Sequence, residues 1–195
     1  AEAAKQFGFG LETYIDLPYE LKGIMPTKQF MNKLYGRWGW AQGALLNIAI
    51  GQGEILVTPL QMSRYINMLA TKGKTPTLHI VKNKNHNIPE PDISIESWNL
   101  IQSYMSKVVT EPKGTGRRSN PKILGLKIWG KTGTAENPHG EPHAWYIAYG
   151  EKNGEMISVV ILLENGGHGG EVAAPLARSV FKHYFSSNRM KLAKK

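Results

Sequence analysis

Cysteine is absent from this sequence, and it contains neither a long apolar run nor an excess of acidic residues. With 0 Cys among 195 residues, the chain has no disulfides and no thiolate metal sites, which leaves its compartment open. The longest apolar stretch, near residues 157–163, is far shorter than the roughly 18 residues that a membrane-spanning helix needs. The 21 Gly and 11 Pro are too few for a collagen-like or low-complexity chain. A globular protein of about one domain in length remains.

The charge balance is basic, with 24 Lys and Arg against 15 Asp and Glu and a formal net charge of +9. The basic residues are spread along the chain, and only Arg117-Arg118 and the segment from Arg189 to Lys195 form small clusters. No motif that enters a nucleic-acid groove is present. The charge therefore predicts a solvated basic surface and no nucleic-acid partner.

Four helices are expected from capping signals and apolar periodicity. The clearest has Thr58 as N-cap, Pro59 at the first helical position and Gln61 as the partner of a capping box, and it ends at Lys72-Gly73. The other three are expected from about Ser94 to just before Pro112, from about Ala174 onward, and over residues 44–50.

Three strand signals lie between the helix that starts at Ser94 and the one that starts near Ala174. Residues 126–129 alternate and lead into Lys-Thr-Gly-Thr, residues 143–149 alternate as well, and residues 156–163 are almost continuously apolar, as expected of a central strand covered on both faces. Asn153-Gly154 lies between the last two and predicts a tight hairpin. The sequence therefore predicts a mixed α/β (α+β) fold, in which helices pack on an antiparallel sheet. Residues 82–92 and 111–122 are expected to be surface loops.

A phosphate-loop pattern, G-x-x-x-x-G-K-[ST], is matched from Gly125 to Thr132, and Glu164 stands at an acidic strand end of the kind that supports Mg²⁺. Such a loop needs a helix directly after its lysine, but Thr-Gly-Thr-Ala-Glu-Asn-Pro follows Lys131. Nucleotide-binding sheets are also parallel, whereas the hairpin here is antiparallel. A P-loop nucleotide-binding enzyme is therefore a remote alternative.

As a strand end, Lys131-Thr132-Gly133-Thr134 offers one cation, two hydroxyls and bare backbone. An extended peptide with a terminal carboxylate can pair with such an edge strand. Gly133 lacks the Cβ that would hold the peptide away. On its own this pattern is weakly specific, since a chance turn has the same letters.

The pattern occurs together with other segments. The chain resembles the transpeptidase domain of class B penicillin-binding proteins, most closely the penicillin-binding protein 2 type, over about residues 1–185. The resemblance lies in these segments: Gly-Gln-Gly at 51–53, Thr-Pro-Leu-Gln at 58–61, Lys-Thr-Gly-Thr-Ala-Glu at 131–136 and Asn-Gly-Gly-His-Gly-Gly at 165–170.

The resemblance implies a peptidoglycan D,D-transpeptidase with a serine β-lactamase-like fold. A serine attacks the D-Ala-D-Ala end of a stem peptide, D-Ala leaves, and an amine of a second stem peptide accepts the acyl group. Lys131 would supply positive potential, and Thr132 and Thr134 would hold the carboxylate of the substrate or of a β-lactam antibiotic, with Gly133 between them. The Thr134 N–H would form half of the oxyanion hole, a donor typically worth roughly 2.7–4 kcal/mol in the transition state. No cofactor and no metal are implied.

The family's nucleophile motif, Ser-x-x-Lys, and its Ser-x-Asn motif both precede Lys-Thr-Gly. Ser119 to Lys122 fits the first by letters, but Pro121 denies it helical spacing. Ser186 to Asn188 fits the second, but it follows Lys131. The nucleophile, the general base and a membrane anchor are therefore expected upstream of residue 1, and the chain alone is expected to be inactive.

The beginning of the chain points the same way, because residues 1–7 form the end of a helix without a start signal, and no secretory signal is visible. Residues 1–185 are expected to be the C-terminal part of the domain, and residues 186–195 a basic polar tail. The resemblance further implies an extracytoplasmic catalytic domain and partners in the cell-elongation machinery. A non-catalytic penicillin- or muropeptide-binding module is the alternative. His139, His143 and His168 are expected in loops near the cleft, and no carboxylate spacing indicates a metal there.

Overall fold

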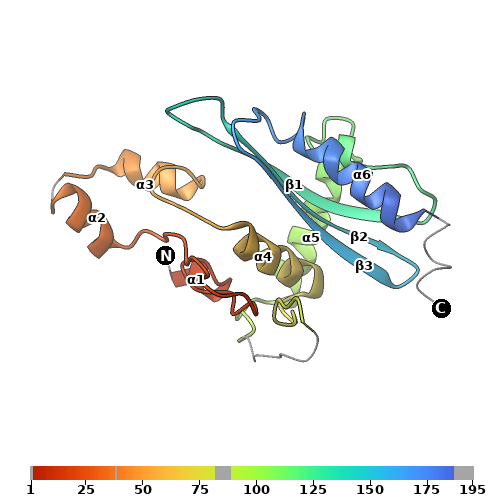
Figure 1. Ribbon diagram of the computed structural model, residues 1–195, viewed down its shortest axis with the longest axis horizontal. Coiled ribbons are helices and arrows are strands. Elements are labelled where there is room, and N and C mark those ends of the chain that lie inside the picture. The colour runs from red at the N-terminus through yellow and green to blue at the C-terminus, as the bar shows by residue number, and fades with distance from the viewer. Residues whose placement is uncertain (1, 38, 82–88, 187–195) are drawn as a thin grey trace. The chain divides into compact units, whose positions relative to one another are not determined.

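The computed structural model describes residues 2–37, 39–81 and 89–186 (Figure 1). The chain divides into two compact units. The first comprises residues 1–68 and 73–92, and the second comprises residues 69–72 and 93–195. In the described parts of the chain, no helix combines the length and apolarity needed to cross a bilayer. The predicted tail lies, from residue 187 onward, outside the described residues.

The first unit is built from helices and connecting loops. The capping box is formed in both directions, because Thr58 Oγ1 accepts from the Gln61 N–H at 3.2 Å and Gln61 Oε1 accepts from the Thr58 N–H at 3.0 Å. The Gln61 amide group also donates to the carbonyls of Leu11 and Lys22. These two hydrogen bonds tie the loop between the first two helices to the helix that contains Gln61. The helices are α1 (Glu2–Gln6), α2 (Lys28–Tyr35), α3 (Gln42–Ala49) and α4 (Pro59–Thr71), of which the last turn belongs to the second unit.

Helix α2 is not predicted from the sequence. Thr27 caps it, with Oγ1 accepting from the Phe30 N–H at 3.1 Å, but its third helical position holds Phe30 instead of the Glu or Gln of a capping box. The start of the helix therefore carries only a weak signal. Helix α3 begins two residues before the predicted residue 44.

The second unit contains the sheet. Helix α5 begins after Ser94, whose hydroxyl accepts from the Ser97 N–H at 3.2 Å. The predicted hairpin is confirmed: Asn153 and Gly154 have φ values of 54° and 80°, and the flanking Lys152 and Glu155 pair with each other. The elements are α5 (Ile95–Thr110), the short 3-10 helix η1 (Arg117–Ser119), β1 (Lys127–Ala135), β2 (His143–Lys152), β3 (Glu155–Leu163) and α6 (Ala173–Phe185).

The strand order is β1-β2-β3, and both pairs are antiparallel. Among the described residues, the prediction that residues 156–163 form a central strand is wrong, because β3 lies at an edge of the three-stranded sheet and its residues are mostly half-buried or exposed. The central strand is β2, with five consecutive buried residues from Tyr146 to Gly150. The apolar run of β3 therefore indicates neither that both faces are covered, since only Val159 is buried, nor how many strands flank it.

Helix α6 packs on the face of the sheet that carries Tyr146 and Gly150. A Cβ at Gly150 would lie 2.9 Å from the Phe181 ring, so the glycine admits the helix close to β2. Figure 1 shows α6 in front of the sheet and α5 behind it, and α5 contacts β1. The core of this unit consists of Val109, Ile128, Ala144, Tyr146, Ala148, Val159, Ala173, Ala174, Ala177, Phe181 and Phe185.

Candidate active site

The predicted site residues lie on β1, an edge strand of the sheet. A Cβ at Gly130 would overlap the Tyr146 hydroxyl, so the even-numbered residues of β1 share the α6-facing side of the sheet with Tyr146. Because side chains alternate along a strand, Thr132 and Thr134 lie on this side and Lys131 on the other. The Lys131 ammonium group is exposed and donates to the Thr132 carbonyl at 2.5 Å.

Thr132 and Thr134 line a cleft of about 680 Å³. Its other walls come from the α5–β1 loop and from the segment that precedes α6. The structure thus brings the two threonines together, while Lys131 lies beside the cleft and does not line it. The lining residues are Pro112, Lys113, Gly114, Thr115, Arg117, Arg118, Thr132, Thr134, His168, Gly170 and Glu171.

The α5–β1 loop is held against the sheet by two hydroxyl pairs. The Tyr146 hydroxyl donates to Ser119 Oγ at 2.6 Å in the interior, and burial raises the pKa of Tyr146 to about 12. Thr115 and Thr132 share a hydrogen bond between their hydroxyls at 2.8 Å. The loop is therefore a fixed wall, although the sequence predicted only a surface loop here. Thr115 between two glycines was the signal that sequence reasoning missed.

Ser119 is fully buried, with 0% exposure, and η1 ends at this residue. Asn120, which follows, has extended backbone angles, and its side chain accepts from the Lys122 N–H at 2.7 Å. Ser119 and Lys122 therefore lack the one-turn helical spacing that would let an amine activate the hydroxyl. The hydroxyl of Ser119 serves packing and hydrogen bonding.

The Asn-Gly-Gly-His-Gly-Gly segment forms the third wall. A Cβ at Gly169 would overlap the carbonyl oxygens of Trp145 and Gly133, so only glycine allows the segment this close to β1 and β2. A Cβ at Gly170 would lie 2.6 Å from the Thr115 carbonyl. The glycines at 169 and 170 therefore join the two strands and the α5–β1 loop at the cleft.

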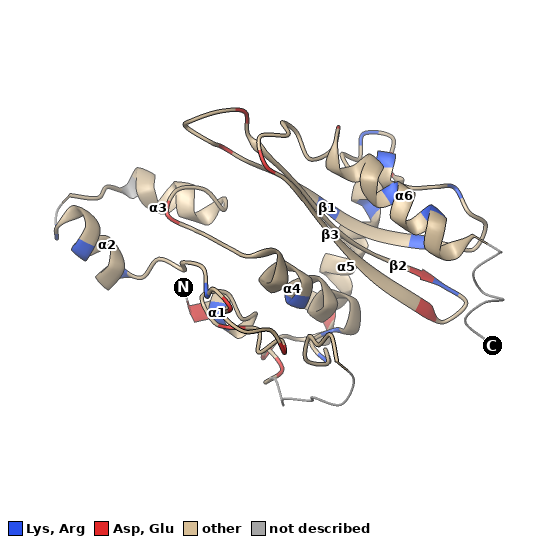
Figure 2. Cartoon of the chain, viewed as in Figure 1, with Lys and Arg blue, Asp and Glu red and all other residues tan. Residues whose placement is uncertain are grey.

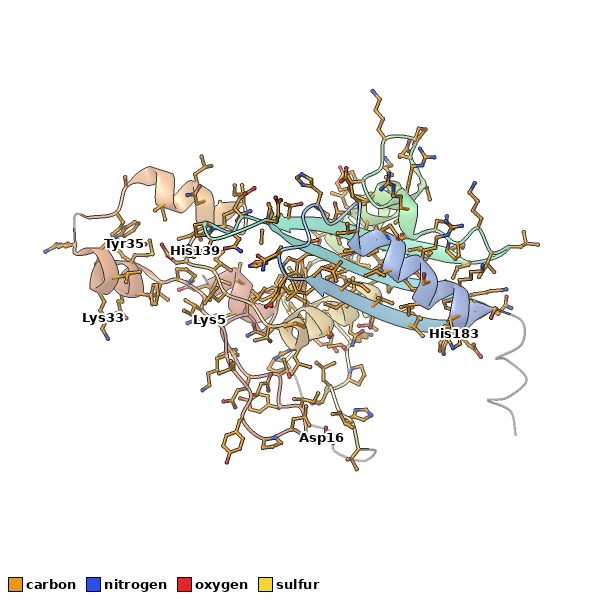
Figure 3. The ribbon with its side chains drawn as sticks, turned by 45° about the horizontal axis from the view of Figure 1, so that its top comes forward. Lys5, Asp16, Lys33, Tyr35, His139 and His183 are labelled. Carbon is orange, nitrogen blue, oxygen red and sulfur yellow. The ribbon has the colours of Figure 1, made fainter. Side chains whose placement is uncertain are left out.

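Of the three predicted histidines, only His168 lines the cleft. His143 is the first residue of β2, so the prediction that it lies in a loop is wrong. Its Nδ1 accepts from the Asn165 N–H at 2.9 Å, which fixes the loop after β3. His139 lies in the β1–β2 loop, and Figure 3 shows it at the opposite end of the second unit from His183. Within residues 2–37, 39–81 and 89–186, no three His, Asp or Glu side chains are grouped to hold a metal ion.

The nucleotide-binding alternative does not agree with this geometry. Its loop requires a helix after Lys131, but β1 continues through Lys131 to Ala135 and pairs antiparallel with β2. The backbone at Lys131 therefore cannot wrap a phosphate group.

An antiparallel sheet covered by α6, with Lys-Thr-Gly on its edge strand, is the arrangement that the resemblance to the penicillin-binding proteins implied. Residues 1–182 match the family described as the penicillin binding protein transpeptidase domain. The chain belongs to this family.

The relatives are of the penicillin-binding protein 2 type, as the sequence predicted. The peptidoglycan D,D-transpeptidase MrdA of Haemophilus influenzae is 33% identical over 208 residues, which cover 93% of this chain and 32% of that protein. The structure of PBP2 from Pseudomonas aeruginosa in complex with WCK 5153 aligns with a TM-score of 0.80 and 29% identity, over 96% of this chain and 43% of that one. The complex between PBP2 and MreC from Helicobacter pylori aligns with a TM-score of 0.77 and 30% identity, over 92% of this chain and 34% of that one. The chain thus spans about a third of the length of the curated relatives it matches.

Proposed function

We propose that this chain is the substrate-binding part of a peptidoglycan D,D-transpeptidase that recognises the D-Ala-D-Ala end of a stem peptide. The observation that carries the proposal is the pair Thr132 and Thr134, which lines a cleft from the edge strand of a transpeptidase-family sheet. Alternate backbone groups of an edge strand have no strand partner, so an extended peptide can pair there. The relatives named peptidoglycan D,D-transpeptidase support the same function.

In this proposal, a serine attacks the carbonyl carbon between the two D-alanines. The C–N bond breaks, D-Ala leaves with a proton on its amine, and an ester remains on the serine. An amine of a second stem peptide then attacks the ester, which forms the cross-link and returns a proton to the serine. Thr132 and Thr134 hold the terminal carboxylate, the Thr134 N–H stabilises the oxyanion, and Lys131 supplies positive potential at the site. β-Lactams enter as analogues of the peptide end.

The serine and its base belong, in this proposal, to a segment N-terminal to residue 1, together with a membrane anchor. The burial of Ser119 supports this assignment, because it leaves that serine unable to reach a ligand. We further propose an extracytoplasmic location, partners in the elongation machinery, and a domain part that covers residues 1–185. The complex of the Helicobacter pylori relative with MreC supports such partners.

A non-catalytic penicillin- or muropeptide-binding module is the second candidate. The burial of Ser119 favours this candidate as well, because within the described residues neither Ser119 nor Lys122 is placed for acyl transfer. The two candidates differ in the covalent step alone: a binding module retains penicillin reversibly, whereas a transpeptidase becomes acylated.

The substitution Lys131→Ala tests the proposed function in the protein extended at its N-terminus to the length of its relatives. Acylation by benzylpenicillin should slow by about tenfold to a hundredfold, because the ammonium group beside the cleft no longer contributes its positive potential to the site. The fold should persist, since the side chain is exposed and surface changes usually cost less than about 0.5 kcal/mol. The measurement is the second-order acylation rate, together with the thermal melting curve.

Lys127→Ala is the matched control, because Lys127 lies on the same strand and the same side of the sheet, outside the cleft. It should leave the acylation rate unchanged. Unchanged acylation in a folded Lys131→Ala protein would remove Lys131 from the mechanism. A loss of ATP binding, with no change toward penicillin, would instead favour the nucleotide-binding alternative.

A further inference from the structure

The wall that faces Thr132 and Thr134 carries three cations. Lys113, Arg117 and Arg118 line the cleft from the α5–β1 loop, and Glu171 is the only acidic residue among the lining residues. Figure 2 shows basic positions in this loop beside α6. In the described chain, no carboxylate oxygen lies within 4 Å of the three cationic groups. The lining of the cleft therefore carries three cations against one carboxylate, next to the hydroxyls of Thr132 and Thr134.

The two arginines are held at the cleft by backbone carbonyls. Arg117 Nη1 donates to the Pro112 carbonyl at 2.6 Å, and Arg118 Nη1 donates to the Glu171 carbonyl at 3.4 Å. A guanidinium group has five N–H donors, so each of these contacts leaves several donors for a ligand. The loop itself is fixed by Ser119 against Tyr146 and by Thr115 against Thr132. The charge is thus presented by a wall whose position is set by the sheet.

We propose that Arg117 and Arg118 form, with Thr132 and Thr134, a carboxylate-binding subsite that determines which peptides and β-lactams this protein accepts. The inference rests on the proposed function and adds the residues that supply the charge. Lys131 does not line this cleft, whereas the planar guanidinium forks do and match a carboxylate in two-pronged geometry. Two carboxylates fit this chemistry: the C-terminal carboxylate of the peptide, and a side-chain carboxylate elsewhere in the same peptide.

The test is the acylation of the N-terminally extended protein and of its Arg118→Gln variant by three penicillins. Benzylpenicillin carries the ring carboxylate, its methyl ester lacks it, and carbenicillin adds a side-chain carboxylate to the same skeleton. Arg118→Gln should lower the second-order acylation constant for a carboxylate-bearing penicillin by about tenfold to a hundredfold, the range of a hydrogen bond to a charged group. Arg118→Lys should retain part of the rate, because it keeps the charge and loses the fork.

The pattern across the three compounds identifies the carboxylate. If Arg118→Gln lowers the acylation constant for benzylpenicillin but not for its methyl ester, the subsite binds the C-terminal carboxylate. A loss confined to carbenicillin assigns it to a side-chain carboxylate. Equal losses with acid and ester, or no loss with either acid, would overturn the subsite.

Arg178→Gln serves as the control, since Arg178 is exposed on α6 and does not line the cleft. It should acylate as the wild type does with all three compounds. Failure of the proposed function is distinguishable, because then the wild-type protein itself would not be acylated. A wild type that reacts, beside an Arg118→Gln variant that reacts equally fast, would contradict the subsite alone.

Discussion

At the residue scale, the hydroxyl of Tyr146 connects the central strand to the loop that forms one wall of the cleft. Its partner Ser119 is fully buried, and the contact is 2.6 Å long. A buried hydroxyl that loses its partner retains the cost of being removed from water. The position of Arg117 and Arg118 therefore depends on a pair of residues that touches no ligand.

Tyr146→Phe should destabilise the protein by about 1–3 kcal/mol at pH 7, because Ser119 Oγ loses its partner. Burial raises the pKa of Tyr146 to about 12 from 10.0. Above pH 10 the unfolded chain loses this proton first, so the wild type loses stability as the pH rises from about 10 through 12. A difference of two pKa units corresponds to about 2–3 kcal/mol. Denaturant unfolding of both proteins from pH 7 to pH 11.5 measures their free energies of unfolding. The difference between the wild type and Tyr146→Phe should narrow as the pH rises above 10.

The control is Tyr104→Phe, since Tyr104 is 53% exposed on α5. It should match the wild type at every pH to within about 0.5 kcal/mol. A Tyr146→Phe protein that is as stable as the wild type at pH 7 would show that the contact with Ser119 does not support the loop.

At the scale of elements, local chemistry predicted the hairpin and the clear helix start. Asn153-Gly154 and the Thr58–Gln61 capping box act within a few residues, so the sequence displays them directly. The place of β3 at the sheet edge and the α5–β1 loop as a cleft wall depend on contacts between distant segments. Thr115 and Thr132 are 17 residues apart, and no periodicity records that contact. The sequence predicts the contiguous residues Lys131 to Thr134 as site candidates, because they form one local motif. It shows Arg117 and Arg118 only as a basic pair, because their place at the cleft depends on contacts between distant segments.

Gly169→Ala tests the junction between the segment before α6 and the two strands. The new Cβ would overlap the carbonyl oxygens of Trp145 and Gly133, which are backbone atoms and cannot rotate away. Overpacking of this kind typically costs about 1–3 kcal/mol. We expect a lower melting temperature and, in the N-terminally extended protein, slower acylation by benzylpenicillin.

Gly43→Ala serves as the comparison, because it should change the stability of the protein in the opposite direction. Gly43 lies in α3, and a Cβ there meets nothing within 4 Å, so alanine should stabilise the helix by up to about 1 kcal/mol. Equal stability of the Gly169→Ala protein and the wild type would mean that the segment moves without cost, and the cleft wall would then be less fixed than the contacts imply.

At the scale of the whole molecule, the proposed function makes the chain one part of a larger catalytic assembly. The chain spans 32% of the Haemophilus influenzae relative, and its cleft offers hydroxyls and cations but no exposed serine paired with a lysine among the described residues. Family membership was predictable from the sequence, because several spaced segments matched together. The position of the nucleophile outside residues 1–195 stays a prediction, which rests on the order of the motifs along the chain.

The division between a binding part and a nucleophile outside it is tested most directly by locating the penicilloyl group on the N-terminally extended protein. After incubation with benzylpenicillin, intact mass spectrometry should show one adduct, and peptide mapping should place it on a serine that precedes residue 1. We predict that no serine within residues 1–195 carries the adduct. A penicilloyl group on Ser119 or any other serine of this sequence would contradict this division, and so would the absence of any adduct.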